Sequence, residues 1–259
     1  MQLDKIIAVR NNKTVFSNEG LCYKVFVSDF SKADVFGEAL NHARVEETGL
    51  SVPKILEVTT VDGKWTVVSE YIEGKSLALL MKENPEKTAE YLGLFVDIQL
   101  EIQKKSCPLL LSLEEKLERE ICPENFSADV FQKLSSSLEL LPKHKKLCHG
   151  DYNPTNVIIR EDGTPFVIDW GHASRGNASF DAANTYLGFL LGGDRAGAEK
   201  YLELFCEKSG TSNRYFEKWL PIAAASRFTR GNAEERAFLA SLFGELNLKK
   251  TENTKGEEK

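Results

Sequence analysis

Three polar residues at a fixed spacing constrain this chain more than any other feature of its sequence. Residues 149–156 read HGDYNPTN, so Asp151 stands five positions before Asn156. Two short apolar runs joined by the turn Glu161-Asp162-Gly163 follow, and the second run ends at Asp169. Apolar runs around such a turn predict a β-hairpin. The hairpin would bring Asp169 back beside Asn156.

The chemistry of these three side chains explains their spacing. A loop that follows a strand holds Asp151 where its carboxylate can accept the proton of an incoming hydroxyl group. Asn156 offers a neutral oxygen, and Asp169 a carboxylate, to the same Mg²⁺, an ion that prefers hard oxygen ligands. Phosphoryl transfer asks a protein mainly for positioning and charge neutralisation. The pattern therefore predicts Asp151 as a catalytic base and Asn156 and Asp169 as metal ligands.

The segments HGDYNPTN and VIDWG closely resemble the aminoglycoside phosphotransferase and choline kinase group. Members of that group are small-molecule kinases that share the protein-kinase fold, with HGD in place of HRD. The resemblance implies an α+β, two-lobed fold with a small antiparallel β-sheet N-lobe and a mainly helical C-lobe. It also implies Mg²⁺ as cofactor and ATP or GTP as co-substrate. The ordinary alternative makes Asp151 to Asn156 a turn and Asp169 the end of a strand.

A kinase-like fold requires a lysine on the third strand and a glutamate on the helix that follows. The segment 21–27 reads LCYKVFV, and the charge of Lys24 is costly among these apolar residues unless it is paired. Glu38 on the next helix is the predicted partner, which leaves Lys24 to hold the α- and β-phosphates. Glu46 and Glu47 share that helix, so the partner could shift along it.

The segment 66–74, TVVSEYIEG, reads as the last strand of the sheet running into a hinge. The family resemblance implies that the main chain of this segment contacts the adenine edge. Glu70 and Ile72 would contribute those main-chain groups, so both are predicted nucleotide-binding residues.

The first hairpin departs from the kinase pattern, which places a glycine-rich loop over the phosphates. Residues 8–14 read AVRNNKT and contain no glycine. Main-chain amides could still hold phosphate if Asn11 or Asn12 adopts positive φ. Arg10 or Lys13 could add charge, and the alternative for both is a solvated hairpin tip.

Strand and helix signals divide the chain into regions. Residues 1–73 hold five strand-like segments and one helix in the order β-β-β-α-β-β, and form the predicted N-terminal nucleotide-binding lobe. Residues 74–246 are mainly helical, with a capping box at Ser112-Leu113-Glu114-Glu115, and form the predicted catalytic and substrate lobe. Residues 247–259 are polar and charged without periodicity, which is typical of a disordered tail.

Composition excludes several classes of function. The net charge is −6 and the pI about 5.5, which argues against nucleic-acid binding. The sequence has no long apolar run and no signal-peptide core, which argues against a membrane partner. Five scattered cysteines without zinc spacing predict reduced thiols. We therefore expect a cytoplasmic protein whose partners are a nucleotide and a small-molecule hydroxyl substrate.

The sequence thus predicts a phosphotransferase that moves the γ-phosphate of Mg-ATP, or Mg-GTP, to a hydroxyl of an aminoglycoside, choline, ethanolamine or sugar-like molecule. Two alternatives stay open. One is a nucleotide-binding pseudokinase with a regulatory role, which the glycine-free hairpin suggests. The other is a protein kinase, which HGD and the short segment after Asp169 disfavour.

Overall fold

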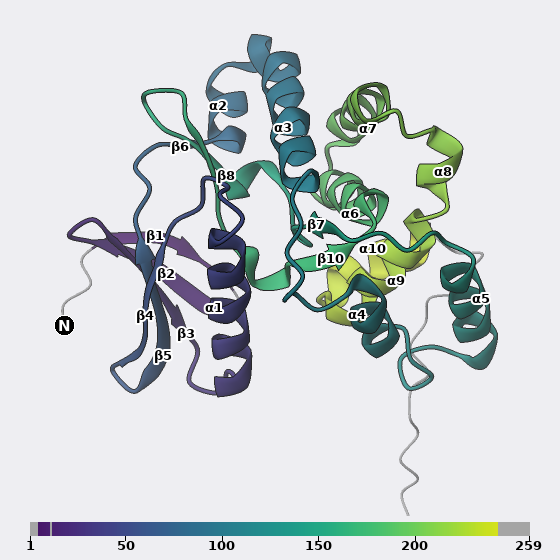
Figure 1. Cartoon of the computed structure of the whole chain (residues 1–259), viewed down its shortest axis with the longest axis horizontal. Coiled ribbons are helices and arrows are strands. Elements are labelled where there is room, and N and C mark those ends of the chain that lie inside the picture. Colours follow the sequence, from purple (N-terminus) through teal and green to yellow (C-terminus); the bar gives the residue numbers. More distant parts are fainter. Residues whose placement is uncertain (1–4, 11, 243–259) are drawn as a thin grey trace, which may run out of the picture. The chain divides into compact units, whose positions relative to one another are not determined.

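The computed structural model describes residues 5–10 and 12–242 (Figure 1). They form two compact units: one from the described residues of 1–110 together with 146–174, the other from those of 111–145 and 175–259. The predicted disorder of residues 247–259 lies outside the described residues. The lobe boundary at residue 73 stays a prediction.

The first unit is built on a five-stranded antiparallel sheet in the order β1-β2-β3-β5-β4. β-branched and aromatic residues favour strands here, and tight turns join them. Asp62 and Gly63 both have positive φ, 49° and 74°, as a two-residue hairpin requires, so Val61 pairs directly with Lys64. The strands are β1 (Lys5–Val9), β2 (Lys13–Asn18), β3 (Leu21–Phe26), β4 (Ile55–Val61) and β5 (Lys64–Glu70).

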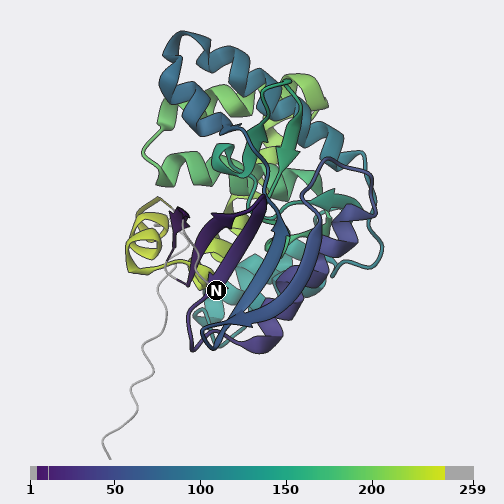
Figure 2. The same ribbon diagram turned by 90° about the vertical axis from the view of Figure 1, so that its left-hand side faces the viewer.

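Helix α1 (Lys32–Glu46) lies along one face of this sheet (Figures 1 and 2). Its buried Val35 packs in one apolar cluster with Phe26 of β3 and Val67 of β5. Burial of each such side chain stabilises the packing by about 1.5–3 kcal/mol. Alternate residues of a strand share a face, so Lys24 points to the same side of β3 as Phe26. The predicted order β-β-β-α-β-β is confirmed, and it brings Lys24 under α1.

The remainder of the first unit supports the HGDYNPTN segment. The predicted hairpin is confirmed: β8 and β9 pair antiparallel, with Val157 opposite Val167. These two strands and β6 make a three-stranded sheet. The elements are β6 (Lys75–Ser76), α2 (Leu77–Glu83), α3 (Thr88–Gln103), β7 (Lys146–Cys148), β8 (Val157–Ile159) and β9 (Pro165–Val167), with 3₁₀ turns at Pro85–Lys87, Pro154–Asn156 and Trp170–His172.

The second unit is helical. The predicted capping box is confirmed: Ser112 Oγ accepts from the amide of Glu115, and the Glu115 carboxylate accepts from the amide of Ser112. Helix α6 is buried along most of its length and contacts α7, α8 and α9. The elements are α4 (Leu113–Glu120), α5 (Ala128–Glu139), β10 (Ser174–Gly176), α6 (Ala178–Leu191), α7 (Arg195–Ser209), α8 (Asn213–Glu217), α9 (Leu220–Arg230) and α10 (Ala233–Leu242). Across the described residues, no helix combines the length and the apolar character needed to cross a membrane.

Candidate active site

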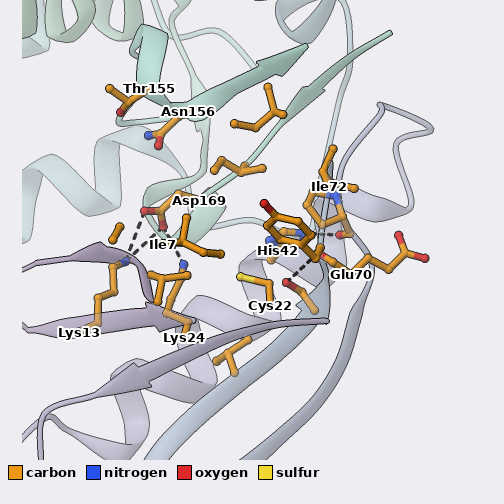
Figure 3. Close-up of a pocket in the computed structure, with 18 of the residues that line it drawn as sticks. Ile7, Lys13, Cys22, Lys24, His42, Glu70, Ile72, Thr155, Asn156 and Asp169 are labelled. Carbon is orange, nitrogen blue, oxygen red and sulfur yellow. Dashed lines mark hydrogen bonds and ion pairs between the residues drawn. The ribbon is translucent and has the colours of Figure 1, made fainter. Parts of the chain in front are cut away.

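The predicted site residues gather around two neighbouring cavities of the first unit, the larger of which is drawn in Figure 3. The larger cavity has a volume of about 500 Å³ and the smaller about 370 Å³. Asp151 lines the smaller cavity, together with Asp169. The predicted residues that line the larger cavity are Lys24, Glu38, Glu70, Ile72, Asn156 and Asp169.

Lys24 joins three segments of the chain. Its ammonium contacts the carboxylate of Glu38 on α1 and lies 3.0 Å from Asp169 Oδ1 after β9. The side chains of Lys24 and Glu38 are only 18% and 16% exposed, so water screens this pair weakly. Glu46 instead accepts a hydrogen bond from the amide of Ile55 at 2.8 Å. Of the glutamates considered on this helix, the structure therefore brings Glu38 to Lys24.

Burial and charge act on this cluster in opposite directions. Burial alone would lower the pKa of Lys24, but the carboxylates of Asp169 and Glu38 raise that pKa above its ordinary value. Burial alone would raise the pKa of Asp169, but the ammonium groups of Lys24 and Lys13 hold that pKa well below its usual range. Both Lys24 and Asp169 are therefore charged at neutral pH.

Gly171 lets α1 approach the segment that carries Asp169. A Cβ atom at Gly171 would lie 2.7 Å from Glu38 Cγ, closer than carbon atoms normally come. Asn41, one turn beyond Glu38 on α1, donates from Nδ2 to the carbonyl of Gly171 at 3.0 Å. Asn41 belongs to no motif of the sequence, although its i, i+3 spacing from Glu38 places both on one helix face.

The loop that carries Asp151 is held by hydrogen bonds of the buried side chain of His149. His149 is fully buried; its Nε2 donates to the carbonyl of Ile168 at 3.0 Å, and its Nδ1 accepts from the amide of Asp151 at 3.2 Å. Gly150 has φ +82°, and a Cβ there would lie 2.3 Å from the carbonyl oxygen of His172. A glycine is needed at this position for both reasons. The HGD sequence is thus explained locally by backbone geometry.

Asn156 and Asp169 lie at the same end of the larger cavity (Figure 3). Asn156 Nδ2 donates to the main-chain carbonyl of Asp151 at 3.0 Å, so the amide presents its oxygen in another direction. Asp169 has φ 66° and ψ 59°, a left-handed conformation that is uncommon outside glycine and is often found at functional sites. This conformation directs its carboxylate toward Lys24.

The donor set of Asn156 and Asp169 fits Mg²⁺. A carboxylate and a neutral amide oxygen are hard ligands, and Mg²⁺ commonly takes its remaining ligands from phosphate and water. Within the part of the chain that the structure describes, no group of three or more His, Cys, Asp and Glu side chains is arranged to hold a metal ion. A metal at Asn156 and Asp169 would therefore depend on nucleotide oxygens to complete its coordination.

Lys13 at the start of β2 belongs to the same cluster, so of the two alternatives for this residue the solvated hairpin tip does not hold. Its side chain is 13% exposed, and its ammonium lies 3.3 Å from Asp169 Oδ1 and 3.6 Å from Glu38 Oε1. Arg10 is exposed, which agrees with the alternative of a solvated tip. Asn11 lies outside the described residues.

The hinge segment offers main-chain groups to the cavity at the opposite end from Lys13. The amide of Glu70 donates to the carbonyl of Lys54 at 2.9 Å, and the amide of Tyr71 donates to the carbonyl of Gly20 at 3.0 Å. The amide of Ile72 makes no such bond to any other described residue. The carboxylate of Glu70 also bonds the Lys54 amide, at 3.1 Å. The bonding of the Ile72 amide is thus compatible with the predicted main-chain role. The amide and the carboxylate of Glu70 both bond to the main chain of Lys54 instead.

The sequence pattern of the phosphotransferase enzyme family matches residues 29–213. The chain belongs to this family. Among curated proteins no match was found. The resemblance noted in the HGDYNPTN and VIDWG segments is therefore confirmed at the level of the family.

Solved structures of other phosphotransferases share this fold. A thermostable mutant of aminoglycoside phosphotransferase APH(4)-Ia has a TM-score of 0.70 and 16% identity, covering 93% of this chain and 92% of that chain. Aminoglycoside-3'-phosphotransferase of type VIII has a TM-score of 0.65 and 15% identity, covering 87% and 94%. Choline kinase LicA from Streptococcus pneumoniae has a TM-score of 0.61 and 17% identity, covering 96% and 89%. The expected protein-kinase-like fold is confirmed; at these identities the likeness concerns the fold alone.

Proposed function

We propose that this phosphotransferase moves the γ-phosphate of Mg-ATP to a hydroxyl of a small molecule, with Asp151 as the catalytic base. The observation that carries the proposal is the contact of Lys24 with both Glu38 and Asp169. This contact couples the sheet, α1 and the segment after β9 at one point of the cavity. Asp151 lines the adjoining cavity, where an acceptor hydroxyl can reach it.

The nucleotide would lie along the larger cavity. Its adenine would meet the main chain of Glu70 and Ile72, with apolar walls formed by residues such as Val15 and Ile158. Its α- and β-phosphates would contact Lys24, whose charge is fixed by its carboxylate partners. GTP remains an alternative co-substrate. The assignment of residues 1–73 to the nucleotide lobe and 74–246 to the catalytic and substrate lobe is part of this proposal.

Asp151 would accept the proton of the acceptor hydroxyl as the acceptor oxygen bonds to the γ-phosphorus. The bond between that phosphorus and the bridging oxygen breaks, and ADP leaves. Mg²⁺, held by Asp169 and the side-chain oxygen of Asn156, would supply neutralisation of the phosphate charge. The hydrogen bonds of the Asp151 main chain to His149 and Asn156 would keep the base in place during the transfer.

The acceptor is proposed as a class. The solved structures with a similar fold include a choline kinase and an aminoglycoside phosphotransferase in a ternary complex with ADP and hygromycin B. An aminoglycoside, choline, ethanolamine or a sugar-like molecule would each offer a hydroxyl of suitable reactivity. We keep the expectations of a cytoplasmic location and of neither a nucleic-acid nor a membrane partner as part of this proposal.

The main alternative is a nucleotide-binding pseudokinase with a regulatory role, and a protein kinase is the second. The glycine-free first hairpin favours the pseudokinase. The charged cluster around Asp169 favours catalysis, because it places a candidate metal-binding carboxylate within 3.3 Å of two ammonium groups that can contact phosphate.

The test is Mg²⁺-dependent release of ADP, or GDP, by the purified chain in the presence of aminoglycosides, choline, ethanolamine and simple sugars. A D151N variant keeps the size of the side chain but removes the base, so we expect it to bind nucleotide and to lose acceptor-stimulated release. Release that continues in D151N at the wild-type rate would contradict the role of Asp151. Nucleotide binding without release for any acceptor, or phosphorylation of a protein instead, would favour one of the two alternatives.

A further inference from the structure

We propose that Lys13 is the ligand of the γ-phosphoryl group during transfer. In this chain its side chain would perform a function that a glycine-rich loop performs with main-chain amides. The inference rests on the proposed kinase function. It selects Lys13 from the two basic residues of the first hairpin and assigns it to one particular phosphate.

Lys13 is built into the sheet as a partly buried charge. It occupies the first position of β2, opposite Phe26 of β3, and its ammonium lies 5.9 Å from the centroid of the Phe26 ring. Only 13% of its side chain is exposed. A lysine at a hairpin tip would normally extend into water, where its charge is best solvated. The carboxylates of Asp169 and Glu38, within 3.3 and 3.6 Å, compensate here for the lost water.

The position of Lys13 between the two cavities assigns it to the third phosphate. Lys24 lines only the larger cavity, and Asp151 lines only the smaller one. Lys13 and Asp169 line both. A triphosphate that enters from the hinge therefore passes Lys24 before it reaches Lys13. The group that reaches Lys13 also lies closest to Asp151, as the transferring phosphoryl group must.

The balance of charges in the cluster allows the ammonium of Lys13 to exchange a carboxylate partner for a phosphate oxygen. Lys13 and Lys24 both contact the same oxygen of Asp169, at 3.3 and 3.0 Å. With Glu38, the cluster contains equal numbers of positive and negative side chains. When the Asp169 carboxylate binds a divalent cation, both ammonium groups lose part of their partner, and phosphate oxygens can replace it. Arg10 also lines both cavities, but it is exposed and its guanidinium donates to the carbonyl of Val9 at 3.3 Å, outside this cluster.

The test compares ATP with ADP in single variants. Dissociation constants for Mg-ATP and Mg-ADP are measured by isothermal titration calorimetry for wild type, K13M, K24M and the control K64M. Lys64 starts β5, is exposed and lies outside both cavities, so K64M removes the same charge without touching the site. Both nucleotides bind to the same free protein. The ratio of the two constants therefore cancels any change in the stability or in the free cluster of a variant.

We expect K13M to weaken Mg-ATP binding about 10- to 100-fold, the usual range for a lost hydrogen bond to a charged group. Mg-ADP binding should weaken by less than about threefold on the same reasoning. K24M should weaken both nucleotides to a similar extent, because Lys24 would meet the phosphates that ATP and ADP share. K13R, which keeps the positive charge, should recover part of the ATP-specific loss.

Equal losses of ATP and ADP binding in K13M would overturn the assignment to the γ-phosphoryl group. Dissociation constants for K13M that equal those of K64M would overturn it as well. Tighter binding of both nucleotides would also overturn it and identify Lys13 as a competitor for the metal site. These outcomes leave the proposed kinase function standing. Absence of Mg-ATP binding by the wild-type chain would overturn the proposed function and this inference together.

Discussion

Addition of one methyl group at Gly171 should break the contact between Glu38 and Lys24 without unfolding the protein. The Cβ of a G171A variant would lie 2.7 Å from Glu38 Cγ and 3.1 Å from Glu38 Cδ. Carbon atoms prefer about 3.5–4.0 Å, so the glutamate side chain has to retreat by roughly 1 Å. Such a shift is large enough to break the contact between Glu38 and the ammonium of Lys24.

The size of the effect follows from what Lys24 loses and what it keeps. A hydrogen bond between charged groups contributes about 1.5–3 kcal/mol, and this one is mostly shielded from water. Lys24 retains Asp169 at 3.0 Å, so we expect the lower end of the range, or about a tenfold weaker affinity for Mg-ATP. The free energy of unfolding should fall by about 1–2 kcal/mol, because the lost contact and the local strain are only partly offset by the roughly 0.4–1 kcal/mol through which alanine restricts the unfolded chain.

The matched control is G37A, in the residue that precedes Glu38 on α1. A Cβ at Gly37 would meet no atom within 4 Å. We expect G37A to stabilise the chain by about 0.5–1 kcal/mol, the usual difference between glycine and alanine inside a helix, and to leave Mg-ATP affinity unchanged. The assay is calorimetric titration with Mg-ATP beside urea unfolding of all three proteins. Wild-type affinity in G171A, or an equal loss in G37A, would refute the reasoning.

Three further expectations concern local features of the fold. S112A removes the N-cap of α4 and should lower the free energy of unfolding by about 1 kcal/mol in urea titration, whereas S112T should restore most of it. G150A should lower the unfolding temperature more than G63A, because both glycines have positive φ but only at Gly150 would the new Cβ meet a carbonyl oxygen, at 2.3 Å; the conformational part alone is about 1–2 kcal/mol. Burial raises the pKa of the Cys22 thiol, so less thiolate is present at pH 8 than in a free cysteine. Alkylation of Cys22 by iodoacetamide, followed by mass spectrometry, should therefore be slower than that of free cysteine, and its rate should rise with pH above 9. Because Cys22 lines the larger cavity, Mg-ATP should slow the alkylation further. An alkylation rate that is the same with and without Mg-ATP would contradict that placement of the nucleotide.

Local patterns in the sequence predict a large part of the fold. The hairpin at Asp62-Gly63 and the capping box at Ser112 depend on residues close together in the chain, and the structure confirms both. The hairpin that returns Asp169 toward Asn156 depends on one turn and two apolar runs, and it is confirmed as well. Each of these features requires a particular backbone geometry from particular residue types, so few other arrangements are compatible with the sequence.

The ion-pair network was harder to predict from the sequence, because it depends on side chains far apart in the chain. Glu46 and Glu47 had the same residue type and the same helix as Glu38. Only the packing of α1 on the sheet determines which of them meets Lys24. The contact of Lys13 with Asp169 was harder still to predict, since 156 positions separate the two residues. A charged residue near a predicted turn gives no signal of burial, so the sequence left a phosphate-binding role and a solvated tip both open for Lys13.

A phosphate ligand on a strand and one on a loop differ in what they require before the nucleotide arrives. Main-chain amides of a glycine-rich loop carry no net charge, so an empty loop needs no counter-ion and can remain mobile. A partly buried lysine needs a carboxylate nearby before phosphate binds, because an unpaired charge that has lost most of its water is costly. In this chain Asp169 and Glu38 supply that partner, which explains why one oxygen of Asp169 is approached by two ammonium groups. The absence of glycine from the first hairpin and the crowding of charge around Asp169 then have a single cause: the hairpin contributes its phosphate ligand as a side chain, and the metal-binding carboxylate neutralises it until phosphate does.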